Sequence, residues 1–266
     1  MRFERDTLVD IGFPDVCALL AAAEWRERAA GASGPESSSA AADFAPVVPH
    51  PSKIVCVGLN YRAHILEMGR EIPQYPTLFA KFEETLIGAH DDVRLPPESQ
   101  KVDWEAELAM VIGTRVRRAT ESQAADAIAG FTVLNDVSMR DWQNRTPMWD
   151  QGKTWEASTP VGPFLVTPDE VAGGVRPTVN ISCVVDGETL QSANTSDLVF
   201  DPVFLVQYIS TIVTLNPGDL IATGTPGGVG QARDPQRFLA DGNLLVTTID
   251  GVGQLSNRTV AEVVKV

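Results

Sequence analysis

The sequence predicts an α+β domain that is rich in β-strands. Short apolar runs of the length of a strand recur along the chain, and most are bounded by Gly, Pro, Asn or Asp. Clear helix patterns are few, strands and helices do not alternate regularly, and no internal repeat is visible. Strand-rich chains without such alternation form α+β folds rather than doubly wound parallel sheets.

The first 50 residues are expected to form a small N-terminal domain with a linker. The stretch MRFERDTLV has the pattern of a strand, and a helix is expected to begin near Pro14. Residues 29–43 are small and polar and include Gly and Pro, which is typical of a linker. The remaining residues, 51–266, are expected to form the catalytic domain.

Most strands are expected in this larger part. They are predicted at residues 54–57, 77–82, 104–113, 131–137, 161–166, 178–186, 219–224 and 243–250. The dipeptides Asp186-Gly187 and Asp250-Gly251 are typical of tight hairpin turns.

Three helices are expected in the same part of the chain. Thr120 and Gln123 have the spacing of a capping box, and Gly130 is expected to end that helix. Asp201, which precedes a proline, is expected to begin another helix. Residues 58–69 are expected to form a loop that carries a short helix.

The net charge of the 266-residue chain is −14, which disfavours binding to nucleic acid and to anionic membranes. An anionic substrate therefore requires a local positive centre. The first residues show no secretory signal, and no apolar run is long enough to span a membrane. Three widely spaced cysteines suggest no disulfide framework. Together these features predict a cytoplasmic protein.

Carboxylates gather around one predicted strand. Glu105 and Glu107 are two residues apart, so they project from the same face of that strand, and Asp103 is a further member. Asp136 ends a second apolar strand and either joins this group or starts a turn. Buried like charges repel, so the group requires solvent or a bound cation. The apolar run that follows Glu107 favours burial, and with it a metal site.

The predicted ligands, Glu105, Glu107 and Asp136, are all hard oxygen donors. This chemistry suits Mg²⁺ or Mn²⁺, with Ca²⁺ as an alternative. Zn²⁺ is disfavoured because no His or Cys is spaced to join the carboxylates.

His64 is the histidine with a catalytic pattern. It lies three residues before Glu67, so the two side chains share one face of a helix. A carboxylate beside a histidine raises its basicity and fixes its tautomer, as a general base requires. An ordinary surface pair is the alternative reading of the same spacing.

Six segments in order resemble the fumarylacetoacetate hydrolase family. They are VGLNYRAHILEMG, PTLFAKF, VDWEAELAMVIG, LNDVSMRDWQ, GKTWEASTPVGP and LIATGTPGGVG, and the resemblance covers roughly residues 50–260. It implies the mixed β-sheet fold of that family, a homodimer, and a Mg²⁺ or Mn²⁺ site. The first 50 residues carry no family motif.

The resemblance also implies roles for individual residues. Glu105, Glu107 and Asp136 match the metal carboxylates, and His64 and Glu67 match a His–Glu pair that activates water. The remaining matches concern the substrate: Lys153 would neutralise developing charge, and Lys81, Arg140, Gln143, Gly224 and Thr225 would contact the substrate.

The function expected from these parts is metal-dependent hydrolysis of a C–C bond in a small 2-oxo or enol carboxylate. Acylpyruvates and fumarylpyruvate from aromatic catabolism are the expected substrates. Alternatives are a 2-hydroxyhepta-2,4-diene-1,7-dioate isomerase and an oxaloacetate-type decarboxylase, because both reactions pass through a similar enolate. A catalytically inactive, metal-binding relative is a further alternative.

Overall fold

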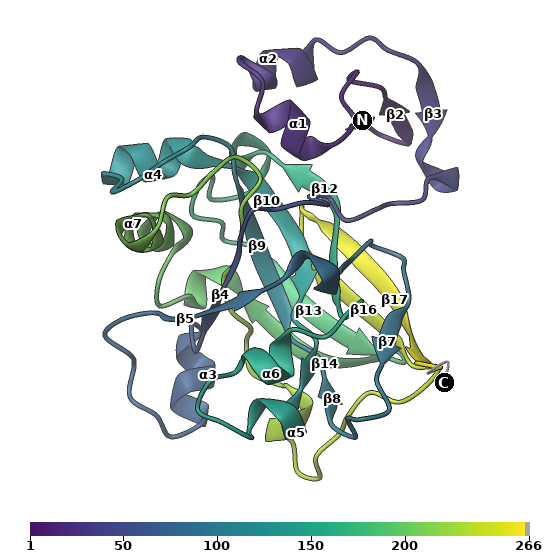
Figure 1. Cartoon of the computed structure of the whole chain (residues 1–266), viewed down its shortest axis with the longest axis vertical. Helices are drawn as coiled ribbons and strands as arrows, with labels where there is room; N and C mark the ends of the chain where they lie inside the picture. The colour runs from purple at the N-terminus through teal and green to yellow at the C-terminus, as the bar shows by residue number, and fades with distance from the viewer. Residues whose placement is uncertain (264–266) are drawn as a thin grey trace.

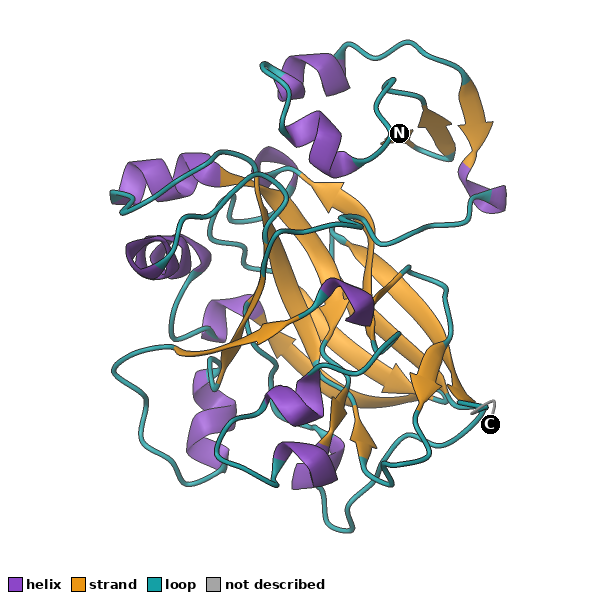
Figure 2. Cartoon of the chain, viewed as in Figure 1, coloured by secondary structure: helices purple, strands orange, loops and turns teal. Residues whose placement is uncertain are grey.

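Two β-sheets form the centre of the molecule, and helices and loops surround them (Figure 2). The computed structural model describes residues 1–263, without the side chains of Ala41 and Glu67. The larger sheet has the order β5-β4-β15-β9-β10-β12-β6 and mixes parallel with antiparallel pairs. Its strands are β4 (Ile54–Gly58), β5 (Thr77–Lys81), β6 (Leu86–Ile87), β9 (Ala106–Ile112), β10 (Ile128–Asn135), β12 (Thr159–Val166) and β15 (Leu220–Ala222).

The second sheet has five strands in the order β14-β13-β16-β17-β7. Its strands are β7 (Val93–Leu95), β13 (Asn180–Val185), β14 (Glu188–Asn194), β16 (Leu244–Ile249) and β17 (Gly253–Ala261). The β13–β14 hairpin turns at Asp186 and Gly187, which both have positive φ, as its sequence predicts. A two-stranded ribbon pairs β8 (Val102–Asp103) with β11 (Ser138–Met139).

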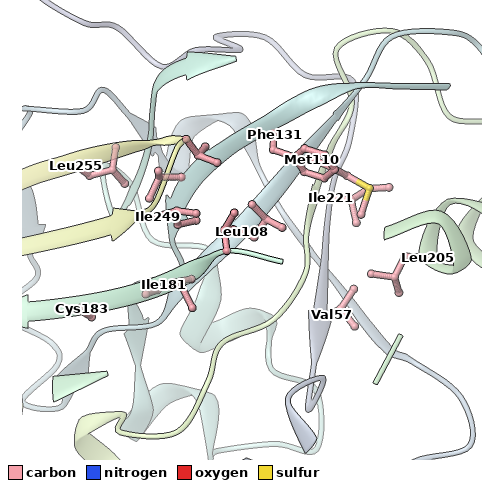
Figure 3. Close-up of a cluster of buried hydrophobic side chains, with 14 of the residues drawn as sticks. Val57, Leu108, Met110, Phe131, Ile181, Cys183, Leu205, Ile221, Ile249 and Leu255 are labelled. Carbon is pink, nitrogen blue, oxygen red and sulfur yellow. The ribbon is translucent and has the colours of Figure 1, made fainter. Parts of the chain in front are cut away.

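The main hydrophobic core lies between these two sheets. On β9, Leu108 and Met110 point into it, and Ile181 and Ile249 of the second sheet close it from the other side (Figure 3). The intervening residues of β9, Ala109 and Val111, face a second apolar cluster on the opposite face of the large sheet. Glu105 and Glu107, at the start of β9, are buried with it.

The N-terminal segment covers that second cluster. Leu19 and Leu20 of α1 (Val16–Leu20) and Trp25 of α2 (Trp25–Ala30) pack into it. The single strand expected at the start of the chain is wrong: Arg5 adopts positive φ, and the segment forms two paired strands, β1 (Arg2–Glu4) and β2 (Thr7–Val9).

The predicted linker also contains structure, because β3 (Glu36–Ser38) pairs with β2. Its small polar residues gave no strand pattern, and the strand forms because β2 offers a free edge. The division of the chain into two domains near residue 50 stays a prediction.

Among the described residues of the larger part, five segments are α-helical: α3 (Arg62–Glu67), α4 (Glu121–Ala127), α5 (Arg140–Gln143), α6 (Asp150–Lys153) and α7 (Pro202–Ile212). The capping box of α4 and the Asp201 cap of α7 are confirmed. Gly130 does not end α4, because β10 follows directly and contains it. Helices α3, α5 and α6 gather at the end of the sheet far from the N-terminal segment (Figure 1).

The prediction of a β-rich α+β fold is confirmed. Among residues 1–263, no helix has the length and apolarity that crossing a membrane requires.

Candidate active site

Three buried carboxylates meet where β9 begins and β10 ends. Glu107 lies opposite Leu134 in the β9–β10 register, Glu105 comes directly before β9, and Asp136 directly after β10. One oxygen from each of Glu105, Glu107 and Asp136 lies within 4.8 Å of the others. The convergence expected from the sequence is therefore present.

Backbone and amide contacts fix this arrangement. The Asp136 N–H donates to the Glu105 carbonyl at 2.8 Å, and the Glu105 N–H donates to Oδ1 of Asn135 at 3.0 Å. Asn135 in turn donates to Thr247 Oγ1 of β16 at 2.9 Å. The second sheet thus helps to hold the carboxylates. Asn135 was not predicted from the sequence, although a polar residue at the end of an apolar strand, next to Asp136, was a signal for it.

Two lysines neutralise part of the carboxylate charge. Lys153 Nζ lies 2.8 Å from Glu105 Oε2 and 2.7 Å from Asp136 Oδ2. Lys81 Nζ lies 2.7 Å from Asp136 Oδ1 and also donates to the Lys153 carbonyl. The Lys81 side chain is 0% exposed. The substrate contact predicted for Lys81 is not supported by this geometry, because its ammonium group is enclosed by protein.

Arg140 connects Glu105 to Asp103. Its Nε lies 2.8 Å from Asp103 Oδ2, and its Nη1 lies 2.7 Å from Glu105 Oε1. Asp103 also accepts from the backbone N–H groups of Gly230 at 2.6 Å and Gln231 at 3.0 Å. Asp103 is therefore not part of the metal-ligand group that the sequence suggested; it anchors Arg140 and the glycine-rich loop.

Short helices α5 and α6 bring these cations together. Arg140 Nη1 donates to Gln143 Oε1 at 2.8 Å within α5. A Cβ on Gly152 of α6 would lie only 2.4 Å from the Gln143 Cβ. Glycine thus allows the two helices to touch, and Lys153 follows as the next residue.

Glu107 differs from its neighbours because it forms no ion pair with a Lys or Arg among the described residues. Its Oε2 accepts from the Gly224 N–H at 2.7 Å. Burial, together with the charges of Asp136 and Glu105, raises the pKa of Glu107 well above its usual range. The Gly224 N–H is occupied by Glu107, so the substrate contact predicted for Gly224 is not supported.

The pKa of Asp136 is shifted in the opposite direction from that of Glu107. Burial alone would raise the pKa of Asp136, but the ammonium groups of Lys153 and Lys81 bring it below its ordinary value. Across the cluster, four carboxylates face the three cations Lys81, Lys153 and Arg140. Glu107 is the carboxylate of this cluster that no Lys or Arg pairs with among the described residues. A divalent cation among hard oxygen ligands fits this donor set and this charge.

Thr225 lies one residue after Gly224, in the loop that follows β15. Its Oγ1 accepts from Gln191 Nε2 at 2.8 Å, and the same nitrogen donates to the Pro226 carbonyl at 2.9 Å. Gln191 Oε1 accepts from the N–H of Ala106, between the two glutamates, at 2.9 Å. Gln191 was not predicted from the sequence, because nothing in the residue pattern of β14 marks it.

His64 is buried on α3, with 7% of its surface exposed. The start of α3 is attached to the site: Asn60 Nδ2 donates to the Thr223 carbonyl at 2.8 Å, beside Gly224. The Glu67 side chain lies outside the described residues, so the expected His64–Glu67 pair stays a prediction.

Comparisons with known proteins identify relatives of this chain. Residues 53–260 match the family model described as fumarylacetoacetate (FAA) hydrolase C-terminal. A human protein named mitochondrial oxaloacetate tautomerase is 43% identical over 235 residues, which are 88% of this chain and 74% of that protein.

Two solved structures extend the comparison. The 2-hydroxyhepta-2,4-diene-1,7-dioate isomerase of Mycobacterium marinum has a TM-score of 0.75 and 35% identity, covering 87% of this chain and 83% of that one. The fumarylpyruvate hydrolase of Pseudomonas aeruginosa, solved with Mn²⁺ and pyruvate, has a TM-score of 0.72 and 32% identity, covering 80% of this chain and 91% of that one.

The predicted cytoplasmic location is contradicted by these comparisons. The human relative is named mitochondrial, as are bovine and rat proteins with the same activity in their names. The three free cysteines on which the prediction partly rested indicate reduced thiols, and they do not distinguish one reducing compartment from another.

Proposed function

The chain belongs to the fumarylacetoacetate hydrolase family, and from this premise we propose that it interconverts the keto and enol forms of a small 2-oxo dicarboxylate such as oxaloacetate. In this reaction a proton leaves the carbon next to the keto group, the C–C bond becomes a double bond, and the keto oxygen takes up a proton. No atom is added to the substrate and none is lost.

The names of the relatives support this reaction over C–C hydrolysis. Six mammalian and amphibian relatives at 43% to 45% identity are named oxaloacetate tautomerases. Tautomerisation was not among the reactions expected from the sequence, but proton transfer is the chemistry of the isomerase alternative. Oxaloacetate is the substrate of the decarboxylase alternative. The predicted alternatives therefore have more support than the predicted hydrolysis.

The observation that carries the proposal is the buried carboxylate group with fixed cations beside it. Glu105, Glu107 and Asp136, with oxygens within 4.8 Å, would hold Mg²⁺ or Mn²⁺. When bound, such an ion supplies Lewis-acid polarisation of the 2-oxo group and offsets the repulsion between substrate and protein.

Lys153 is suited to donate to the oxygen on which charge develops. An ammonium group has three N–H donors, and two of those on Lys153 are occupied by Glu105 and Asp136. Burial alone would lower the pKa of Lys153, but Asp136 and Glu105 raise it above its ordinary value. Lys153 therefore stays a cation and stabilises negative charge rather than acting as a base.

Arg140, Gln143 and Thr225 would bind the carboxylates of the substrate. Nη2 of Arg140 is buried and meets no acceptor among the described residues. A buried guanidinium N–H without an acceptor is costly, so a substrate carboxylate would complete its hydrogen bonding. The amide oxygen of Gln143 is held by Arg140, which leaves its NH₂ group available for the substrate.

His64 would act as the base that removes the carbon-bound proton and returns it. It lies on α3, which Asn60 attaches to the loop that carries Thr225. Glu67 would orient the imidazole, as the spacing along the helix predicts.

The proposal is tested by mixing the purified protein with the enol form of oxaloacetate and following the loss of its ultraviolet absorbance. Faster conversion with Mg²⁺ or Mn²⁺, and loss of that acceleration with EDTA, is the expected result. A coupled assay for pyruvate on the same samples measures decarboxylation separately. The proposal is wrong if pyruvate forms at the rate at which the enol is lost.

Hydrolysis of fumarylpyruvate is the second candidate, because the solved hydrolase that acts on it shares the fold at 32% identity. A panel of fumarylpyruvate, an acylpyruvate and 2-hydroxyhepta-2,4-diene-1,7-dioate compares the reactions directly. A higher kcat/KM for fumarylpyruvate cleavage than for oxaloacetate tautomerisation would favour this candidate.

A further inference from the structure

Gln191 is a buried amide that joins two parts of the site. It is 1% exposed and lies on β14, at the edge of the second sheet. The β13–β14 register shifts between Cys183 and Val184, so β14 has an extra residue there, and adjacent residues Leu190 and Gln191 are both buried. Such a bulge redirects a side chain that regular alternation would place on the outer face.

The bulge lies directly against the glycine-rich loop. A Cβ on Gly228 would lie 2.0 Å from the Leu190 carbonyl oxygen, so only glycine permits this contact. As a result the Gln191 side chain reaches both Ala106, between Glu105 and Glu107, and the Thr225–Pro226 turn.

The hydrogen-bond partners of the Gln191 amide allow only one of its two possible orientations. Its oxygen faces the Ala106 N–H at 2.9 Å, and its nitrogen faces the Pro226 carbonyl oxygen at 2.9 Å. Rotating the amide by half a turn would place a donor against a donor and an acceptor against an acceptor. Nε2 is therefore held as the group that donates to Thr225 Oγ1.

This fixed donor determines what the Thr225 hydroxyl can do. A hydroxyl has one O–H, and because Thr225 accepts from Gln191, that O–H points away from Gln191. In the part of the chain that the structure describes, Thr225 donates to no protein acceptor. Thr225 thus offers a hydrogen-bond donor to whatever lies beside it.

We propose that Gln191 is a positioning residue that makes Thr225 a dedicated donor, so that this subsite prefers a carboxylate, to which the hydrogen bond is charge-assisted, over a carboxamide, whose oxygen accepts a weaker hydrogen bond. The inference rests on the proposed function, in which Thr225 holds a carboxylate of the substrate. Gln191 touches neither substrate nor metal; it acts through the Thr225 hydroxyl.

The test compares pyruvate with pyruvamide, which replaces the carboxylate with a carboxamide. Dissociation constants are measured by calorimetry on the full-length protein with Mn²⁺. Gln191→Glu keeps the acceptor for Ala106 but offers an acceptor to Thr225, so the hydroxyl turns round and presents its lone pairs. The same carboxylate oxygen also faces the Pro226 carbonyl oxygen, so the fold of this variant is checked first by circular dichroism. Pyruvate should bind roughly tenfold more weakly, since a hydrogen bond to a charged group is lost, while pyruvamide, which loses only a weaker neutral hydrogen bond, should change by roughly threefold or less.

A Thr225→Val background separates this effect from the added negative charge. If Gln191 acts through the hydroxyl, Gln191→Glu should change pyruvate binding by less than about twofold when Thr225 is already Val. A loss that persists in the Thr225→Val background, or an equal loss for pyruvate and pyruvamide, overturns the inference.

Gln191→Met is the second variant, for use if Gln191→Glu does not fold as judged by circular dichroism. It removes the fixed donor without adding charge, so the preference for pyruvate over pyruvamide should fall roughly threefold. An unchanged preference overturns the inference. If the wild-type protein with Mn²⁺ does not bind pyruvate, the proposed function fails as well. If the wild type binds pyruvate but the variants do not show the expected changes in affinity, only the inference about Gln191 fails.

Discussion

The ammonium group of Lys81 donates to Asp136 Oδ1 at 2.7 Å, and neither side chain is exposed to solvent. Lys81 comes from the end of β5, whereas Asp136 follows β10, on the other side of the large sheet's centre. The pair therefore joins distant strands of one sheet. Lys81 neutralises the buried carboxylate of Asp136 and is not free to contact the substrate.

Replacing Lys81 should reveal this role through stability. Lys81→Met leaves Asp136 buried beside one cation instead of two, which should lower the free energy of unfolding by about 3 kcal/mol in EDTA. Mn²⁺ should restore part of that loss, because it supplies positive charge to the same carboxylate. Urea unfolding with EDTA and with Mn²⁺ measures both effects.

Lys53→Met is the matched control, because Lys53 pairs with buried Asp219 at 2.8 Å, but its own side chain is 25% exposed. Its loss of stability should be smaller and should not depend on Mn²⁺. If both variants respond equally to Mn²⁺, Lys81 has no particular link to the carboxylate group.

Glu107 is the carboxylate on which metal binding should depend most. Glu107→Gln keeps the size of the side chain and removes the charge that no Lys or Arg pairs with in the described residues. The affinity for Mn²⁺ should fall at least about a hundredfold, and tautomerase activity should fall with it. Electron paramagnetic resonance of free Mn²⁺ measures the binding independently of activity.

Glu188→Gln serves as the control for Glu107→Gln, because Glu188 is 59% exposed and pairs with Arg237 at the surface. It should bind Mn²⁺ as the wild type does. Retention of wild-type Mn²⁺ affinity in Glu107→Gln would contradict the proposed ligand set.

His64 should contribute to proton transfer without contributing to metal binding. His64→Ala should lower kcat for oxaloacetate tautomerisation by about 10²- to 10⁴-fold, as expected for the loss of a general base. Decarboxylation, which needs no base at carbon, should be affected less. His50→Ala is the control, since the His50 side chain is 76% exposed. Equal loss of tautomerisation and decarboxylation in His64→Ala would rule out the base role.

Arg140 should not be replaceable by lysine. The guanidinium group contacts Asp103 through Nε and both Glu105 and Gln143 through Nη1, and its Nη2 meets no acceptor among the described residues. A lysine provides one ammonium group and cannot match this geometry. Arg140→Lys should therefore raise KM for oxaloacetate roughly tenfold or more. Titration with oxaloacetate measures KM, and an unchanged value would show that Arg140 makes no substrate contact.

The sequence by itself determined the features that depend on neighbouring residues. The two-residue spacing of Glu105 and Glu107 placed both on one face of a strand, and the caps at Thr120 and Asp201 set the starts of α4 and α7. Strand periodicity and helix capping act over a few residues, so they can be read directly from the chain. The family motifs, which are also short segments of the chain, predicted the fold and the group of carboxylates.

The tertiary structure alone decided the partners of the charged groups. Lys81 pairs with a residue 55 positions away, and Gln191 reaches Thr225 across 34 positions. A cation can satisfy itself on any nearby carboxylate, so its partner is determined only when strand register and loop contacts fix the distances. For the same reason Asp103, which the strand spacing had grouped with the glutamates, pairs with Arg140. A bulge that no sequence pattern marked turns Gln191 toward the site.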